Sequence, residues 1–159
     1  MSLRTLITAG AVALTASAAS AETSVYVGFG ADYGVPEAGD NQAFGSFIAG
    51  ATFDVWENIG LGIEGEVGEP VGGDGVQRET SRLRGLFTYE FGAVTGIASL
   101  GSVQYEIGDA TFDGETFGLG AQMDFRERWT GRVEVMQDFN DEDFDTNVTT
   151  ARVAVFFNF

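Results

Sequence analysis

The sequence predicts an all-β fold, an eight-stranded antiparallel up-and-down transmembrane β-barrel. Three observations support this prediction: eight segments in which apolar residues alternate with small or polar ones, connections that alternate between short and long, and aromatic residues at the segment ends. Alternation with a period of two is the pattern of a strand with one apolar face. Segments of about 10–12 residues have the length that a tilted strand needs to cross a bilayer.

The first 21 residues predict a secretory signal peptide that precedes a single barrel domain, residues 22–159. Arg4 supplies the positive charge, the stretch from Leu6 to Ala16 is mostly apolar, and Ala19-Ser20-Ala21 fits the small-residue pattern cut by signal peptidase. The apolar stretch is too short for a membrane-spanning helix.

The eight predicted strands carry most of their large apolar side chains at odd positions. The fifth is the weakest, because Leu100 is out of phase with Ile97 and Val103. The connections after the second, fourth and sixth strands are short, whereas those after the other strands are longer and acidic. The strands are Thr23–Tyr33, Ala43–Val55, Ile59–Gly68, Ser81–Phe91, Thr95–Ile107, Glu115–Phe125, Thr130–Phe139 and Val148–Phe159.

The alternation alone does not say which face of the sheet is outside, because a soluble ligand-carrying barrel shows the same pattern turned inside out. The even positions hold many glycines and serines, which suit a narrow interior. Aromatic residues such as Trp56 and Trp129 gather near strand ends, as in the girdles of membrane barrels. The chain stops on Phe159, so we expect the last strand to close onto the first. These features favour odd positions facing lipid.

With odd positions outside, the charged residues at even positions face the lumen, where charges need partners. We expect the glutamates of the third strand to pair with the arginines of the fourth, and Arg152 to lie near Arg132 and Glu134. Arginine suits such pairing because its planar fork binds carboxylates with two bonds. The predicted lumen charges are Glu64, Glu66, Arg82, Arg84, Glu90, Glu106, Asp124, Arg132, Glu134, Asp138 and Arg152.

Two roles are open for these lumen charges. They form either a paired polar plug or a selectivity ring in a conducting pore. The narrow interior of an eight-stranded barrel favours the plug. Acids outnumber arginines seven to four in this set, so any leak is expected to prefer cations.

The composition excludes several function classes. The chain has no cysteine and no histidine, which removes disulfides, thiol or Ser-His-Asp nucleophiles and most zinc sites. Its formal net charge of −16 disfavours nucleic acid as a partner. We predict no enzymatic activity, no cofactor and no specific metal site. Asp141, Asp143 and Asp145 have the spacing of a calcium loop, but Thr146 stands at its glycine position; weak divalent binding there stays open.

The last residues, Arg152-Val153-Ala154-Val155-Phe156-Phe157-Asn158-Phe159, resemble the C-terminal assembly signal of bacterial outer-membrane proteins, with Phe157 and Phe159 as its aromatic positions. Residues 22–159 resemble the small eight-stranded porin-family barrels that include the opacity proteins and the transmembrane domain of OmpA. Phe117–Phe139 is the most family-like hairpin. The resemblance is one of pattern, and the periplasmic domain of OmpA has no counterpart in this sequence.

This resemblance implies a bacterial outer-membrane location with both termini in the periplasm. The implied partners are outer-membrane lipid and lipopolysaccharide, the barrel-assembly machinery and periplasmic chaperones, and the implied state is a monomer. The expected function is that of a structural or surface-interaction protein with acidic extracellular loops and a largely plugged lumen. The alternative is a narrow passive channel for small solutes, preferring cations. A lipid deacylase, a third class found among such barrels, is disfavoured by the lack of histidine.

Overall fold

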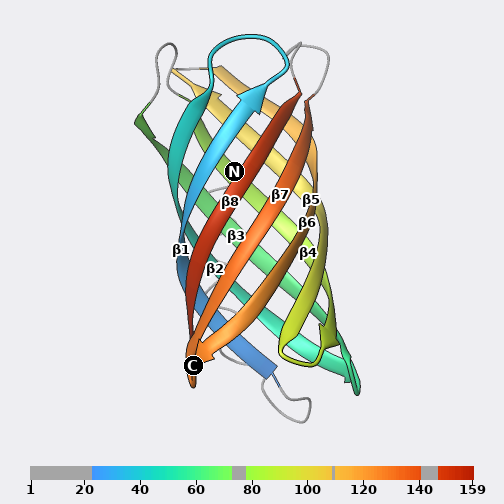
Figure 1. Ribbon diagram of the computed structural model, residues 1–159. Helices are drawn as coiled ribbons and strands as arrows, with labels where there is room; N and C mark the ends of the chain where they lie inside the picture. The colour runs from blue at the N-terminus through green and yellow to red at the C-terminus, as the bar shows by residue number, and fades with distance from the viewer. Residues whose placement is uncertain (1–22, 73–77, 109, 141–146) are drawn as a thin grey trace.

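The computed structural model describes residues 23–72, 78–108, 110–140 and 147–159, which form one closed antiparallel barrel of eight strands in chain order (Figure 1). The predicted fold class is confirmed. The predicted signal peptide and the Asp141–Asp145 segment lie outside the described residues. The strands are β1 (Thr23–Pro36), β2 (Gln42–Trp56), β3 (Ile59–Gly72), β4 (Glu79–Phe91), β5 (Val94–Ile107), β6 (Ala110–Arg126), β7 (Trp129–Asn140) and β8 (Val148–Asn158).

Pairing of β8 with β1 closes the barrel. The register runs from Tyr26 opposite Asn158 to Pro36 opposite Val148. At the end of the chain the backbone N–H of Phe159 donates to the carbonyl of Val25 at 3.0 Å. Closure leaves no strand edge with unpaired backbone groups, which is the condition for a sheet to lie in lipid. In the described part of the chain no helix is long and apolar enough to cross a membrane.

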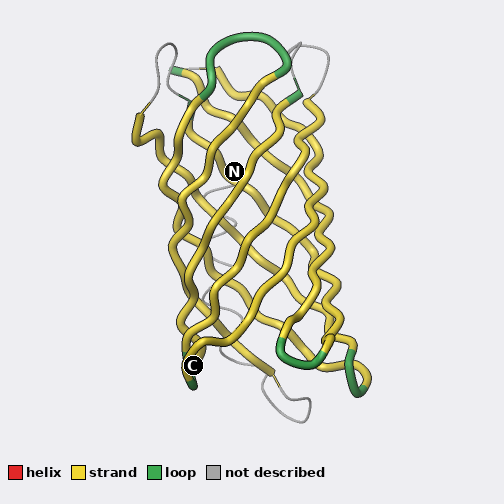
Figure 2. The backbone as a smooth tube through the Cα atoms, viewed as in Figure 1, coloured by secondary structure: helices red, strands yellow, loops and turns green. Residues whose placement is uncertain are grey.

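The two ends of the barrel differ (Figure 2). At the turn end, which also holds the C-terminus, two-residue turns at 57–58, 92–93 and 127–128 join β2 to β3, β4 to β5 and β6 to β7. The opposite end, the loop end, holds the longer connections. The predicted loop after the fifth strand is wrong, because β5 and β6 stay paired up to Ile107 opposite Ala110. The side chain of Gln104 donates to Asp113 at 2.8 Å and helps to extend this hairpin.

The polarity of the barrel is the reverse of that of a water-soluble domain. Large apolar side chains cover its outside, with Phe29 70% and Val153 61% exposed, while Glu64 and Arg82 inside are at most 2% exposed. In soluble proteins most charged side chains are exposed, and broad apolar patches on the surface are rare. An apolar band around a closed sheet is the surface that lipid requires.

Odd positions face outward along the middle of every strand except β5, where the alternation is inverted. In β5, Leu100 is 66% exposed, whereas Ile97, Val103 and Tyr105 are at most 4% exposed. The sequence interpretation of this strand is therefore wrong. Leu100, which the sequence pattern placed out of phase, faces outward like the large apolar residues of the other strands. Glu106, expected in the lumen, lies on the outward face opposite Glu79 and Thr111.

The turns explain the inversion. A two-residue turn pairs an odd position with an even one, as Phe91 with Val94. Paired residues share a face of the sheet, so in the strand after the turn the even positions face outward and the odd positions face inward. The β2–β3 and β6–β7 hairpins also have two-residue turns, but each contains a register shift, near Asp54 and Asp124, that restores the phase. The β4–β5 hairpin has no such shift, and the β5–β6 turn reverses the exchange.

The inverted phase of β5 is testable by spin labelling, because the chain has no native cysteine. We expect a label on Leu100→Cys to be accessible to oxygen dissolved in lipid, and labels on Val103→Cys and Ile97→Cys to be shielded. Power-saturation EPR on refolded protein in vesicles measures this accessibility. Labels on Phe117→Cys and Thr116→Cys of β6 give the outward and inward references. An accessible label at 103 with a shielded one at 100 would contradict the structure.

Gly101 lies opposite Arg84 in the β4–β5 pair, where there is no room for a side chain. A Cβ at this position would overlap the carbonyl oxygen of Leu83 and lie 2.7 Å from the Cα of Arg84. We expect Gly101→Ala to lower the free energy of unfolding by about 1–3 kcal/mol, as overpacking does. Gly85→Ala in the same hairpin is the matched control, because its Cβ would meet nothing nearer than 3.8 Å. Urea unfolding of both variants in vesicles measures the difference, and equal stabilities would refute the steric argument.

Candidate functional site in the barrel interior

Among the described residues, nine charged side chains gather in the interior, each at most 4% exposed. They come from five strands, β1, β3, β4, β7 and β8, so segments far apart in the sequence meet inside the barrel. We call this set the central ion-pair network: Asp32, Glu64, Glu66, Arg82, Arg84, Arg132, Glu134, Asp138 and Arg152.

Arg82 of β4 joins two walls of the barrel. Its Nη1 donates to Glu66 of β3 at 2.5 Å, and its Nη2 donates to Asp138 of β7 at 2.6 Å. The hydroxyl of Tyr105, which the inverted phase of β5 turns inward, donates to the same Asp138 carboxylate at 2.5 Å. Charge-assisted bonds of this length are among the stronger hydrogen bonds in proteins.

Arg84 and Arg132 hold Glu64 between them. Arg84 donates to Glu64 and, through Nη1, to Glu134 at 2.6 Å. Arg132 donates to the other oxygen of Glu64 at 2.6 Å, and Tyr26 donates to that oxygen at 2.8 Å. The Arg132 guanidinium also lies 4.3 Å from the ring centroid of Phe156, a cation–π distance. Glu64 on β3 thereby has partners on three other strands, β1, β4 and β7, through Tyr26, Arg84 and Arg132.

Arg152 of β8 forms the most complete contact. It donates through Nε and Nη2 to both oxygens of Asp32, at 2.7 and 2.6 Å. Nη1 and Nη2 also donate to the two oxygens of Glu66, at 2.6 and 2.7 Å. Two bidentate pairs use the planar fork that distinguishes arginine from lysine. Ser46 donates to Asp32 at 2.8 Å and brings β2 into the cluster.

The structure places eight of the eleven predicted lumen charges in this network. Glu64 lies opposite Arg84 and Glu66 opposite Arg82 in the β3–β4 register, which gives the pairing expected from the hairpin. Glu134 lies opposite Arg152, with 4.0 Å between the charged groups. The eight residues are Glu64, Glu66, Arg82, Arg84, Arg132, Glu134, Asp138 and Arg152.

Sequence reasoning missed Asp32, although its even position on the first strand was a sufficient signal. Tyr26 could have been predicted in the same way. Tyr105 could not, because Leu100 is the one large apolar residue out of phase in the predicted strand and the odd positions of β5 hold more large apolar side chains. With Asp32 inside and Glu106 outside, the network holds five carboxylates and four arginines. The expected seven-to-four excess of acids in the lumen is thus reduced to five to four at its centre.

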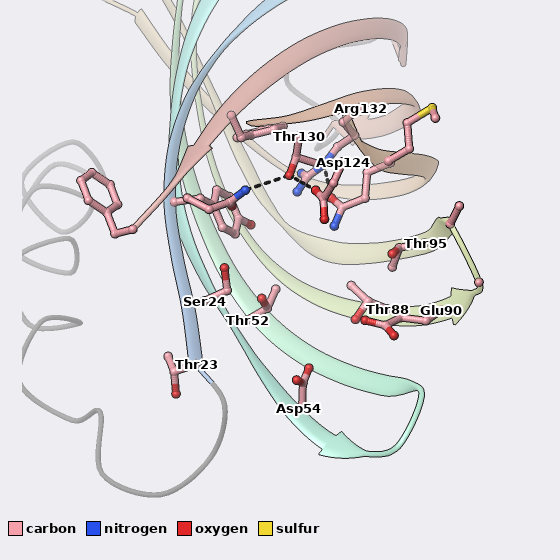
Figure 3. Close-up of a pocket in the computed structure, with 18 residues that line it drawn as sticks. Thr23, Ser24, Thr52, Asp54, Thr88, Glu90, Thr95, Asp124, Thr130 and Arg132 are labelled. Carbon is pink, nitrogen blue, oxygen red and sulfur yellow. Dashed lines mark hydrogen bonds between the residues drawn. The ribbon is translucent and has the colours of Figure 1, made fainter. Parts of the chain in front are cut away.

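The other two predicted residues, Glu90 and Asp124, line a cavity of about 660 Å³ at the turn end, which we call the vestibule (Figure 3). Its inner end reaches Tyr26, Arg132 and Phe156. Thr130 donates to Asp124 and accepts a hydrogen bond from the side chain of Asn158 at 2.9 Å. The vestibule is therefore a polar hollow that stops at the central network.

The chemistry of the interior is electrostatic. Its carboxylates are occupied by guanidinium and hydroxyl donors and are not arranged as ligands. Among the residues that the structure describes, no group of three or more acidic side chains is placed to hold a metal ion. What the arrangement does is tie β1, β3, β4, β7 and β8 together across the lumen.

Removal of one network arginine tests this role. We expect Arg84→Leu to lower the free energy of unfolding by about 3–5 kcal/mol, because it leaves Glu134 without its 2.6 Å partner. Urea unfolding in vesicles of phosphatidylcholine alone measures the loss, and Arg126→Leu, at an exposed arginine, is the control with a change within about 0.5 kcal/mol. The double variant Arg84→Leu/Glu134→Leu should regain part of the loss. Equal effects of Arg84→Leu and Arg126→Leu would contradict the network.

No protein-family model and no curated protein sequence matches this chain. Solved structures do match. The attachment invasion locus protein Ail of Yersinia pestis is 10% identical with a TM-score of 0.59, over 89% of this chain and 100% of that one. Neisserial surface protein A is 8% identical with a TM-score of 0.60, over 86% and 97%. The N-terminal β-barrel domain of OprF from Pseudomonas aeruginosa is 16% identical with a TM-score of 0.58, over 84% and 97%.

These identities are low, so the likeness concerns the fold. The closed barrel of eight strands in chain order matches these structures over 84–89% of this chain. The chain therefore has the fold of the small eight-stranded outer-membrane β-barrels.

Proposed function

We propose that this chain is an integral outer-membrane protein with a structural and surface-interaction role, whose lumen is closed by the central ion-pair network. The inverted polarity is the observation that carries the proposal. Apolar side chains such as Phe29 and Val153 are exposed around the outside, while nine charges are buried inside. A surface of this kind is stable in lipid and would aggregate in water.

The proposed orientation puts the turn end in the periplasm and the loop end outside the cell. Short turns at one end and longer connections at the other are typical of outer-membrane barrels. Both the start of β1 and the end of β8 lie at the turn end (Figure 1), so both termini are then periplasmic. Phe157 and Phe159 would serve there as the signal read by chaperones and the barrel-assembly machinery.

Burial and pairing support the plug. A hydrated ion crossing the lumen would have to separate carboxylates from guanidinium groups that lie 2.5–2.7 Å apart on five strands. Breaking one such buried pair costs about 3–5 kcal/mol. The network therefore acts as a barrier between the vestibule and the loop end.

The loop end supports a surface role. Its exposed residues include Glu37, Asp40, Glu69 and Asp113, so this end presents negative charge to the medium. Two of the matching structures are named as an attachment invasion protein and a surface protein. By analogy, this protein would contact lipopolysaccharide and external ligands at its loop end. It would do so as a monomer and without enzymatic activity.

A cation-preferring channel is the second candidate, and three observations favour it. The vestibule, a polar cavity of about 660 Å³, extends from the turn end to the network. The network has one more carboxylate than arginine. In addition, Glu134 Oε2 is buried without a hydrogen bond among the described atoms. A transient opening at this oxygen would admit a cation before an anion.

Conductance separates the two functions. We expect protein refolded in detergent, and shown to be folded by its shifted migration on an unboiled gel, to be silent in a planar bilayer. Arg82→Ser/Arg84→Ser removes two positive partners and should open a cation-selective path. Arg126→Ser/Arg128→Ser, at the exposed turn, is the matched control and should stay silent. Steady wild-type channels would instead establish the porin function.

A further inference from the structure

The arginines of this protein are distributed unevenly. Of the seven in the described residues, four belong to the central network and Arg78 precedes β4 at the loop end. The remaining two, Arg126 and Arg128, stand at the β6–β7 turn and are exposed. Neither has an ion-pair partner within the described ranges. In a chain with 24 acidic residues, two arginines that flank a single glutamate and have no such partner are a local exception.

A bulge puts Arg126 on the outside of the barrel. Simple alternation would turn this even position toward the lumen. The register shift between Asp124 and Arg126 instead pairs Arg126 with Trp129, which lies on the outward face with Phe157. Cross-strand partners share a face, so the guanidinium of Arg126 and the indole of Trp129 leave the sheet on the same side.

Aromatic rings flank the two arginines. Trp129 packs edge-to-face on Phe157 at 5.3 Å between centroids, and Phe157 packs in the same way on Phe159 at 5.4 Å. The turn itself is anchored, because the N–H of Asn158 donates to the carbonyl of Arg128 at 2.9 Å. Between these groups lies an outer-surface hollow of about 410 Å³, lined by Arg126, Glu127, Arg128, Trp129 and Phe157. We call it the arginine–aromatic hollow.

We propose that the arginine–aromatic hollow binds the headgroup of an anionic phospholipid in the leaflet at the turn end. This inference rests on the proposed membrane function. The occupant must be amphiphilic, because the lining combines two arginines and one glutamate with the apolar rings of Trp129 and Phe157. Val155, two positions before Phe157 on the same face of β8, is 41% exposed and continues the apolar surface. Guanidinium groups bind phosphate oxygens through their planar fork, and tryptophan prefers the headgroup level of a bilayer.

The other turns lack this combination. Trp56 is the last residue of β2 and lies on the outward face opposite Ile59, but the two residues of the turn that follows are Glu57 and Asn58. The β4–β5 turn consists of Gly92 and Ala93. The protein therefore carries its own comparison: two tryptophans at the same end of the barrel, Trp129 beside two arginines and one glutamate, and Trp56 beside a glutamate with no arginine.

Fluorescence quenching by brominated lipids tests the proposal at each tryptophan separately. Trp56→Phe leaves Trp129 as the sole tryptophan, and Trp129→Phe leaves Trp56. Each refolded variant is placed in phosphatidylcholine vesicles with a fixed minor fraction of phosphatidylglycerol. Bromine is carried either by the phosphatidylglycerol or by an equal amount of the phosphatidylcholine. We expect brominated phosphatidylglycerol to be enriched about threefold or more at Trp129 and not at Trp56, since each basic residue attracts anionic lipid.

Charge removal gives the decisive comparison. Arg126→Gln/Arg128→Gln in the Trp56→Phe background should abolish the enrichment, whereas Arg78→Gln at the loop end should leave it unchanged. Unaltered enrichment in the double variant, or equal enrichment at the two tryptophans, overturns the inference and leaves the membrane function standing. Absence of quenching by either lipid in folded protein would mean that the barrel is not in the bilayer, and would overturn both.

Discussion

Four guanidinium groups lie in a lumen too narrow to hydrate them, and three of the four are each held by two carboxylates on different strands. This pairing is the constraint on which the rest of the structure depends. Because a buried charge without a partner is costly, each arginine fixes the relative position of the strands that supply its acids. Arg152, for example, donates to Asp32 directly opposite it on β1 and to Glu66 on β3, so it ties the closing pair of strands to another wall of the barrel.

Charge pairing and strand phase are linked. The residues that reach the network do so only while their strands present the correct face, and turn geometry decides that face. Tyr105 reaches Asp138 because the β4–β5 turn has no register shift, and Arg126 leaves the lumen because the β6–β7 hairpin has one. The presence or absence of a bulge at the turn end thus determines whether a charged residue faces the lumen or the outside of the barrel.

Much of this architecture follows from the sequence, because a period of two is a strong signal over eight long strands. The pairs Glu64–Arg84 and Glu66–Arg82 were predictable from a single hairpin, and Arg152 from its parity. The face of β5 was not predictable. Its outcome depends on the pairing of Phe91 with Val94, one residue of register that composition does not reveal. Asp113 was assigned to a loop for a related reason, since polar residues can extend a hairpin beyond the apolar band when they pair with each other, as Asp113 does with Gln104.

The separation of the network residues along the chain also constrains how the barrel is made. Asp32 and Arg152 are 120 positions apart, and neither has its partner until the first and last strands meet. If the strands entered the bilayer one at a time, unpaired carboxylates and guanidinium groups would have to lie in its hydrocarbon core. Curling of the whole chain, with its polar face already turned inward at the water boundary, avoids that barrier. A chain that lacked β8 would leave Asp32 and Glu66 without Arg152, so the central charges favour entry into the bilayer only after the last strand has joined the first.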